Sequence, residues 1–291
     1  MMPFLARSLA ATLMAALLVT ATADNAFAAE KAKLKALLIT GGCCHDYPNQ
    51  IKIITQGLSQ RVSIEWDVVH VPGGERNIKV PVYQNHDWIK PYDLVVHNEC
   101  FGAVDDVEFV EGIVAAHTDN KIPAIFIHCS MHSYRNAKTD EWRKLIGMRS
   151  TSHEKLHPLD VITLQSDHPI MQGFPKKWHV ERGELYKIEK TWEQVTPLAK
   201  AYGVETEQDH TIIWTNEYKD TKVFATTLGH FNETMNNDVW LGVVARGVLW
   251  TVDALNEDGS PKEGYAGTGG SGPIDLNADN PDKDKKPTLA K

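Results

Sequence analysis

Histidine recurs beside acids and amides where four apolar segments of this 291-residue chain end. The four polar stretches are residues 43–47, 97–100, 128–135 and 228–232. An imidazole titrates near neutral pH and is a common metal ligand, and a nearby carboxylate supports either use. A single histidine at a strand end is more often structural than functional. Four such stretches together therefore predict one polar functional centre.

The segments before these stretches predict the elements that position them. Residues 35–40, 64–71, 93–98 and 124–128 have the length and apolar character of strands. Helical periodicity covers 49–59, 105–119 and 140–146, between and after those strands. Strands that alternate with helices predict a parallel sheet covered on both faces. Ligands bind outside the carboxyl ends of such strands, so the four stretches are expected to line one crevice.

The second half of the chain predicts an extension of the same sheet. Short strands are expected at 161–164, 196–202, 210–218 and 223–228, partly antiparallel, with a closing helix at 240–254. From residue 257 to 291 Gly, Pro, Asp and Lys dominate, which predicts a disordered polar tail. Residues 29–256 are therefore expected to form a single α/β domain.

The amino terminus predicts export. Arg7 precedes an apolar run at 9–22, and Ala26-Phe27-Ala28 supplies a small-residue cleavage site, so residues 1–28 are expected to be a signal peptide. The mature protein would be periplasmic or secreted and would have no membrane segment after cleavage. A net charge of -8 argues against a nucleic-acid partner. Gly41-Gly42 fits neither the dinucleotide nor the P-loop pattern, so no nucleotide cofactor is expected.

The four cysteines all follow predicted strands and allow three interpretations. In an exported protein Cys100 could form a disulfide with Cys129 or with one of the adjacent pair, Cys43 and Cys44. Zinc binding is less favoured because no C-x-x-C spacing occurs. Cys129 also stands where a strand-to-helix nucleophile would stand, but nothing in the sequence activates it. Buried or paired cysteine is the favoured interpretation.

A series of short motifs resembles one known family. The motifs, in order, are His45-Asp46, the segment 128–132, Leu145-Ile146-Gly147, His168-Pro169-Ile170, Gly183-Glu184-Leu185-Tyr186, Gly229-His230 and the segment 246–250. Together they are similar to the ThuA-like (trehalose-utilisation) family, over about residues 35–254. The resemblance implies a flavodoxin-like, class I glutamine amidotransferase-like three-layer sandwich, mostly parallel with an antiparallel extension. It also implies a role in carbohydrate metabolism, with a small-molecule carbohydrate as partner.

Two departures from the family pattern affect the expected chemistry. Cys43 and Cys44 replace part of the Gly-rich run before the first His-Asp, and Gly183 stands where a first carboxylate is usual. Glu184 remains. Because the family lacks glutaminase chemistry, the chain is not expected to be a glutamine amidotransferase, and no Cys-His-Glu mechanism is assigned to Cys129.

Two mechanisms fit the residues that match the family motifs. In one, Glu184 with His128 and His230 performs general acid/base catalysis on a sugar or keto-sugar. In the other, which we favour slightly, His128, His132, His230 and Glu184 bind a divalent metal such as zinc. The expected substrate contacts are His45, Asp46, Tyr47, Asn98, Glu99, Tyr134 and Asn232. Aromatic residues that could stack on a sugar are Tyr47, Trp88, Tyr134, Tyr186 and Phe231.

Two alternatives to a sugar-processing enzyme remain at this stage. The same residues would suit a carbohydrate-binding protein without catalysis. An amide hydrolase that uses Cys129 is the least favoured function. The sequence leaves the oligomeric state open.

Overall fold

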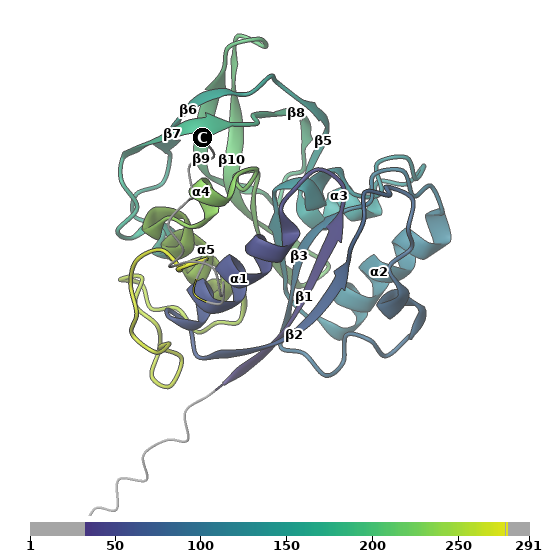
Figure 1. Ribbon diagram of the computed structural model, residues 1–291, viewed down its shortest axis with the longest axis horizontal. Coiled ribbons are helices and arrows are strands. Elements are labelled where there is room, and N and C mark those ends of the chain that lie inside the picture. Colours follow the sequence, from purple (N-terminus) through teal and green to yellow (C-terminus); the bar gives the residue numbers. More distant parts are fainter. Residues whose placement is uncertain (1–32, 277, 279–291) are drawn as a thin grey trace, which may run out of the picture.

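The computed structural model describes residues 33–276 and 278, so the predicted signal peptide lies outside the described residues (Figure 1). Nine strands form one sheet in the order β2-β1-β3-β4-β11-β10-β9-β6-β7. Its parallel part contains β1 (Leu34–Gly42), β2 (Ile64–Val71), β3 (Leu94–Cys100), β4 (Ala124–Ile127) and β11 (Thr221–Thr226). Its antiparallel part contains β10 (Gln208–Tyr218), β9 (Thr196–Gly203), β6 (His157–Thr163) and β7 (Lys177–Gly183). The predicted mostly parallel sheet with an antiparallel extension is confirmed.

Helices cover both faces of the parallel part. Figure 1 shows α1 (Tyr47–Ser59) and α5 (Asp238–Thr251) on one side, and α2 (Val107–Asn120) and α3 (Glu141–Ile146) on the other. Successive strand residues point to opposite faces, so each strand supplies both layers. Leu38 and Val96 belong to the core beneath α1 and α5, whereas their neighbours Leu37 and Val95 belong to the core beneath α2. The chain therefore forms the predicted three-layer sandwich.

Several elements differ from the sequence prediction. The first helix begins at Tyr47 and not at the predicted residue 49, and Asp46 caps it, because its carboxylate accepts the backbone N–H of Asn49. The prediction missed β7, the short helix α4 (Asn232–Met235) and a separate two-stranded sheet of β5 (Met148–His153) and β8 (Tyr186–Thr191). Short 3-10 helices also occur at Pro81–Gln84 (η1), His128–His132 (η2) and Pro169–Met171 (η3). These strands and helices are too short, or too polar on one face, to show a clear hydrophobic periodicity in the sequence.

The predicted disorder from residue 257 is wrong for residues 257–276. This segment lies against α1 and α5, where Ala266 forms an isolated bridge with Val62 and Ile274 exchanges hydrogen bonds with the side chain of Asn236. Backbone hydrogen bonds to the end of α1 compensate for its low apolar content. The remainder of the predicted tail, apart from residue 278, lies outside the described residues. None of the helices at 33–276 is both long and apolar enough to cross a bilayer.

Candidate His/Glu metal centre

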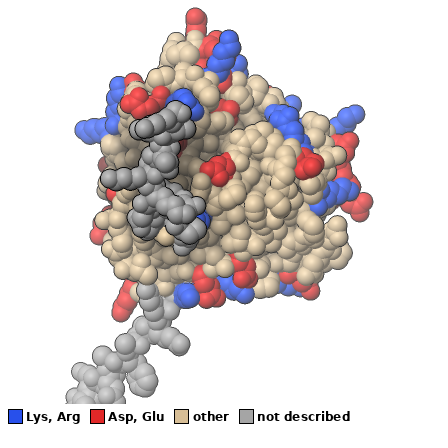
Figure 2. All heavy atoms as spheres, viewed as in Figure 1, with Lys and Arg blue, Asp and Glu red and all other residues tan. Residues whose placement is uncertain are grey.

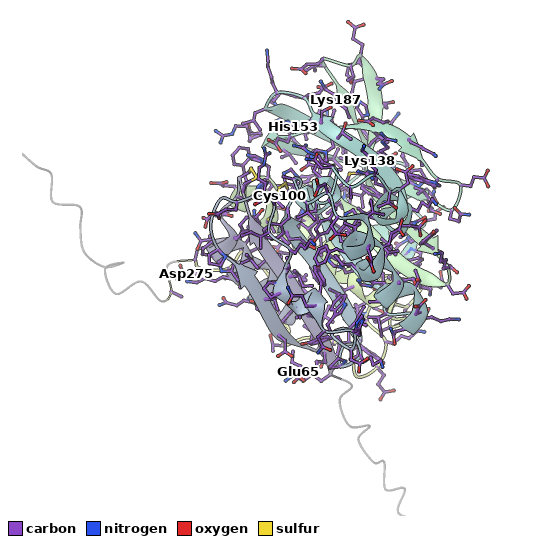
Figure 3. The ribbon with its side chains drawn as sticks, turned by 90° about the vertical axis from the view of Figure 1, so that its right-hand side faces the viewer. Glu65, Cys100, Lys138, His153, Lys187 and Asp275 are labelled. Atoms are coloured by element: carbon purple, nitrogen blue, oxygen red, sulfur yellow. A yellow bond between two sulfur atoms is a disulfide. The ribbon has the colours of Figure 1, made fainter. Side chains whose placement is uncertain are left out.

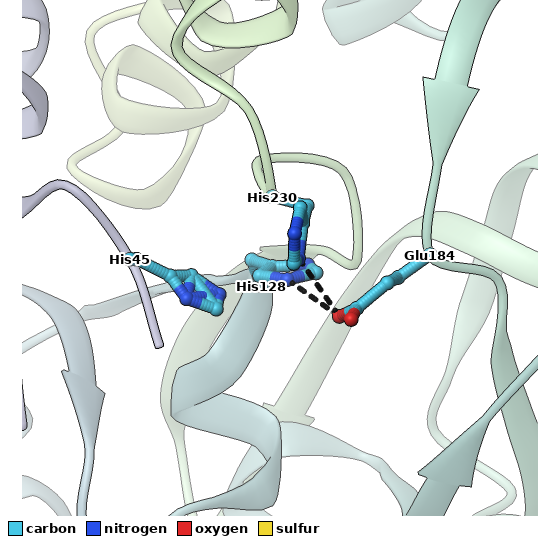
Figure 4. Close-up of side chains that lie close together, drawn as sticks. All are labelled: His45, His128, Glu184 and His230. Atoms are coloured by element: carbon cyan, nitrogen blue, oxygen red, sulfur yellow. Dashed lines mark ion pairs between the residues drawn. The ribbon is translucent and has the colours of Figure 1, made fainter. Parts of the chain in front are cut away.

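Three histidines and one glutamate meet at the carboxyl edge of the sheet. His45 follows β1, His128 follows β4, Glu184 links β7 to β8, and His230 lies between β11 and α4 (Figure 4). One ligand atom from each of the four residues lies within 4.8 Å of all the others. We call these four residues the His/Glu centre.

Glu184 is in close contact with two of the three histidines of the His/Glu centre. Its Oε2 atom is 3.0 Å from His230 Nδ1 and 3.2 Å from His128 Nε2, the two pairs joined by dashed lines in Figure 4. Its Oε1 atom is 3.5 Å from Nε2 of His153, the last residue of β5. One carboxylate therefore faces three imidazoles from three different parts of the fold.

The backbone fixes the direction of His128. The residue stands at the turn from β4 into η2 with φ of 46°, in the left-handed region that non-glycine residues rarely adopt. Its Nδ1–H donates a 2.6 Å hydrogen bond to the carbonyl of Thr227, which leaves the Nε2 lone pair directed at Glu184. An imidazole held in this way by a backbone carbonyl is typical of metal ligands.

Several nitrogen atoms of the His/Glu centre are buried without a hydrogen-bond partner. They are both ring nitrogens of His45, Nε2 of His128 and Nδ1 of His230. Leaving a buried polar atom unsatisfied costs about 1–3 kcal/mol. Imidazole nitrogens and a carboxylate oxygen are also the ligands that zinc takes in catalytic sites. This donor set therefore fits a divalent transition metal.

The protonation states also suit a metal. Burial, and then the nearby His128 and His230, lower the pKa of His45 to about 3. Burial likewise lowers the pKa of His128. Burial acts to raise the pKa of Glu184, but the nearby imidazoles of His128 and His230 hold it well below its usual range. A neutral His45 and a neutral His128 beside an ionised carboxylate are the forms that bind metal.

His132, a predicted metal ligand, lies outside this group of four. Its ring stacks on Tyr186 at a centroid distance of 3.9 Å, and its Nε2 atom forms a 2.9 Å hydrogen bond with the hydroxyl of Ser150. The ring is therefore already engaged on both its face and its edge. His45, predicted only as a substrate contact, takes the place expected for His132.

Three predicted substrate contacts are buried away from the crevice. Asn98 bonds to Thr40 and Gln50 inside the fold. Glu99 accepts hydrogen bonds from Tyr83 and from Tyr134, and all of its side chain is buried. Asn98, Glu99 and Tyr134 therefore do not line the cavity beside the His/Glu centre, and their contact with a substrate stays a prediction. Side chains alternate along a strand, so residues at the end of β3 do not all face the ligand edge.

The remaining predicted contacts surround the His/Glu centre. Asp46 accepts a 2.7 Å hydrogen bond from the amide of Asn232, which joins the start of α1 to the start of α4 at the rim. Tyr47 is buried, and its hydroxyl donates to the carbonyl of Cys43. Asp46 and Asn232 are thus placed to contact a ligand, whereas Tyr47 supports the loop that carries His45.

A small cavity of about 120 Å³ lies beside the His/Glu centre. Its walls include Arg76, Arg135 and His153, which the sequence analysis did not assign to the site. Arg135 lies within the polar stretch 128–135 and could have been included from the sequence. Arg76 and His153 come from loop and edge segments without a motif, so only the fold brings them here.

All four cysteines form disulfides near this cavity. Cys100 is bonded to Cys129, which was one of the predicted alternatives. Cys43 is bonded to the adjacent Cys44, a pairing that the sequence analysis did not include. The Sγ atoms of Cys43 and Cys100 are 3.7 Å apart, so the two disulfides are in contact. Figure 3 shows Cys100 on the same side of the molecule as His153, and far from Glu65 at the start of β2. With every thiol oxidised, Cys129 has no nucleophilic sulfur to offer.

Comparison with known proteins places this chain in a family. The ThuA family, described as trehalose utilisation, matches residues 35–251, which is most of the chain. The chain belongs to the ThuA family. This membership connects it with carbohydrate utilisation and covers every residue of the His/Glu centre. No curated protein matches the chain.

Two solved structures of ThuA-like proteins share the fold. One from Parabacteroides merdae is 18% identical, with a TM-score of 0.62 over 81% of this chain and 97% of that protein. One from Bacteroides uniformis is 14% identical, with a TM-score of 0.60 over 79% of this chain and 96% of that protein. At these identities the likeness shows the ThuA fold, and residue roles rest on the geometry described above.

Proposed function

We propose that this ThuA protein is an exported enzyme that acts on a sugar or keto-sugar at a divalent metal held by the His/Glu centre. The observation that carries the metal is the set of buried, unpartnered imidazole nitrogens around the ionised Glu184. The family description supports a carbohydrate substrate. The signal-like residues 1–28 support export.

The residues around the His/Glu centre are arranged for chemistry on an oxygen-rich substrate. A zinc ion bound by His45, His128, His230 and Glu184 would polarise a sugar carbonyl or a water as a Lewis acid. Arg76 and Arg135 line the cavity and would donate to sugar oxygens or to a developing oxyanion. His153, partly exposed and 3.5 Å from Glu184, is placed to exchange a proton with solvent.

Metal binding by single-residue variants tests the proposal first. We expect the purified protein to bind about one zinc per chain, and His45→Gln and His128→Gln to weaken binding at least about 10-fold, because each removes a ligand. His86→Gln, on an exposed histidine outside the site, is the matched control and should bind zinc as the wild type does. Elemental analysis and zinc titration measure this. A wild type that binds no transition metal contradicts the metal centre.

Turnover of sugars tests the enzymatic part separately. The zinc-loaded protein should convert a sugar or keto-sugar from a panel examined by mass spectrometry, and Glu184→Gln should abolish that conversion while the fold is retained. Saturable sugar binding without any product would favour the non-catalytic alternative. Activity that survives complete metal removal would instead favour acid/base catalysis by Glu184 with a histidine.

A further inference from the structure

Two further spaces lie next to the cavity at the His/Glu centre. Cys44 and His45 line both the cavity of about 120 Å³ and an open space of about 520 Å³, which we call the mouth. Phe231 and Glu233 line both the mouth and a third space of about 450 Å³ between β7 and α4, which we call the groove. Because neighbouring spaces share wall residues, the cavity, the mouth and the groove adjoin one another in this order.

The volumes of the cavity and the groove limit which part of a ligand each of them can hold. Small-molecule sites usually occupy about 300–1,000 Å³. The cavity of about 120 Å³ is below this range and can hold only the reacting end of a substrate. The groove, at about 450 Å³, is within the range and can hold a separate ligand unit. The rest of a substrate therefore has space beyond the mouth.

Phe231 joins the groove to the His/Glu centre. Its ring packs against His230 at a centroid distance of 4.3 Å, and the guanidinium of Arg182 lies 3.9 Å from the centre of the same ring. His230 is one of the four residues of the centre, whereas Arg182 lines the groove. The ring of Phe231 therefore separates a ligand that contacts Arg182 from His230 of the His/Glu centre.

The groove combines an apolar wall with unpaired polar groups. Trp178 and Val180 of β7 form the wall. Because β7 is the last strand of the sheet, one edge of its backbone pairs with no other strand of that sheet. Within residues 33–276, neither Arg182 nor Glu233 has an ion-pair partner, and they line the groove from β7 and α4. Aromatic surface with a few convergent polar groups is typical of sites for small polar organic molecules.

We propose that the groove is a second sugar subsite, so that the substrate is a neutral glycoside with one unit at the His/Glu centre and another in the groove. The apolar face of the second ring would pack on Trp178, and its hydroxyls would bond to Arg182 and Glu233. This proposal rests on the proposed function, because it extends the same site. It assigns substrate-binding roles to Trp178, Arg182 and Glu233, which lie outside the centre.

The charges of the groove favour a neutral ligand over a phosphorylated one. Glu181 and Glu233 line the groove with a single arginine, Arg182, so carboxylates outnumber guanidinium groups. A phosphate would be repelled by these carboxylates. On the part of the displayed face that is not covered by grey atoms, Figure 2 shows Lys and Arg side chains mainly around the edge. The second unit is therefore expected to be an uncharged sugar.

Calorimetric titration of the zinc-loaded wild type with glucose, trehalose, maltose, cellobiose and glucose 6-phosphate tests the subsite. We expect at least one disaccharide to bind about 10-fold more tightly than glucose, and glucose 6-phosphate to bind no more tightly than glucose. Arg182→Ala and Glu233→Ala should lower disaccharide affinity about 10-fold and leave glucose affinity and zinc content unchanged. Arg149→Ala and Tyr202→Ala are matched controls on exposed residues outside the groove and should change nothing.

The outcomes separate the subsite from the proposed function. If glucose binds but every disaccharide binds no more tightly, or if the groove variants weaken glucose and disaccharides equally, the subsite is overturned and the centre stands. If glucose 6-phosphate binds most tightly, the neutral-ligand assignment is overturned. If no sugar binds the zinc-loaded wild type, the carbohydrate function fails, and the subsite fails with it.

Discussion

At the scale of single residues, His128 combines three constraints. Its backbone has φ of 46°, its Nδ1–H is donated to Thr227, and its Nε2 atom faces Glu184 at 3.2 Å. Non-glycine residues in such a conformation cost free energy, and they persist where the surrounding structure requires them. From the sequence, Cys129 stood where a strand-to-helix nucleophile would stand. In the structure the left-handed backbone conformation at this turn belongs to His128, the residue before Cys129.

The backbone cost at His128 can be measured with two variants. Both His128→Gly and His128→Ala remove the imidazole, but only glycine adopts a positive φ without a Cβ clash. We expect metal-free His128→Gly to have a free energy of unfolding about 1 kcal/mol higher than metal-free His128→Ala. Urea denaturation of the two variants measures the difference. An alanine variant as stable as the glycine variant would show that position 128 carries no such strain.

At the scale of elements, the helices pack on the sheet through specific glycines. Gly247 in the middle of α5 faces β11, and a Cβ atom there would lie 2.4 Å from the ring of Phe224. Gly112 in α2 is exposed, and a Cβ atom there would meet nothing within 4 Å. Glycine has the same intrinsic cost inside either helix, so only the packing distinguishes the two positions.

The same substitution should therefore have opposite effects in the two helices. We expect Gly112→Ala to raise the free energy of unfolding by about 0.5–1 kcal/mol, because alanine favours the helix. Gly247→Ala should lower it by about 1–3 kcal/mol, because the core beneath α5 has no space for a methyl group. Thermal and urea denaturation would show this. A stabilised Gly247→Ala protein would contradict the contact between α5 and Phe224.

The elements that the sequence predicted well are those with a strong hydrophobic period. The strands β1, β3 and β4 and the helices α1, α2 and α5 are buried on one or both faces, so their apolar residues recur at the spacing of the structure. The edge strand β7 and the pair β5 and β8 have mixed burial and no such period. Their pairing depends on contacts distant in sequence, which a local pattern does not contain.

At the scale of the whole molecule, the site was predictable only in part. His45, His128 and His230 follow strands that the parallel sheet aligns, so their meeting could be inferred from the order of elements. Glu184 entered through the family motif. The exclusion of His132, the burial of Glu99 and the approach of His153 depend on side-chain directions near the ends of elements, which the sequence does not specify.

The packing of the whole domain also keeps His117, which lies outside the His/Glu centre, in the neutral form. His117 of α2 is fully buried, where its Nδ1–H donates to the carbonyl of Ile122 and its Nε2 atom lies 3.0 Å from Nε2 of His97. Burial, and then the nearby His97, lower the pKa of His117 to about 3. In the unfolded chain this residue is protonated below about pH 6.5, the usual pKa of a histidine, so folding is linked to release of a proton in acid.

This linkage predicts how the stability of the molecule changes with pH. Between about pH 6.5 and pH 3 the unfolded state binds a proton at His117 that the folded state does not bind, so stability must fall as the pH falls through this range. One such proton corresponds to about 1.4 kcal/mol per pH unit. In metal-free protein, His117→Gln should therefore reduce the slope of unfolding free energy against pH by about that amount between about pH 5.5 and pH 4. Urea titrations of both proteins across this range give the two slopes directly, and equal slopes would mean that His117 is protonated in the folded domain.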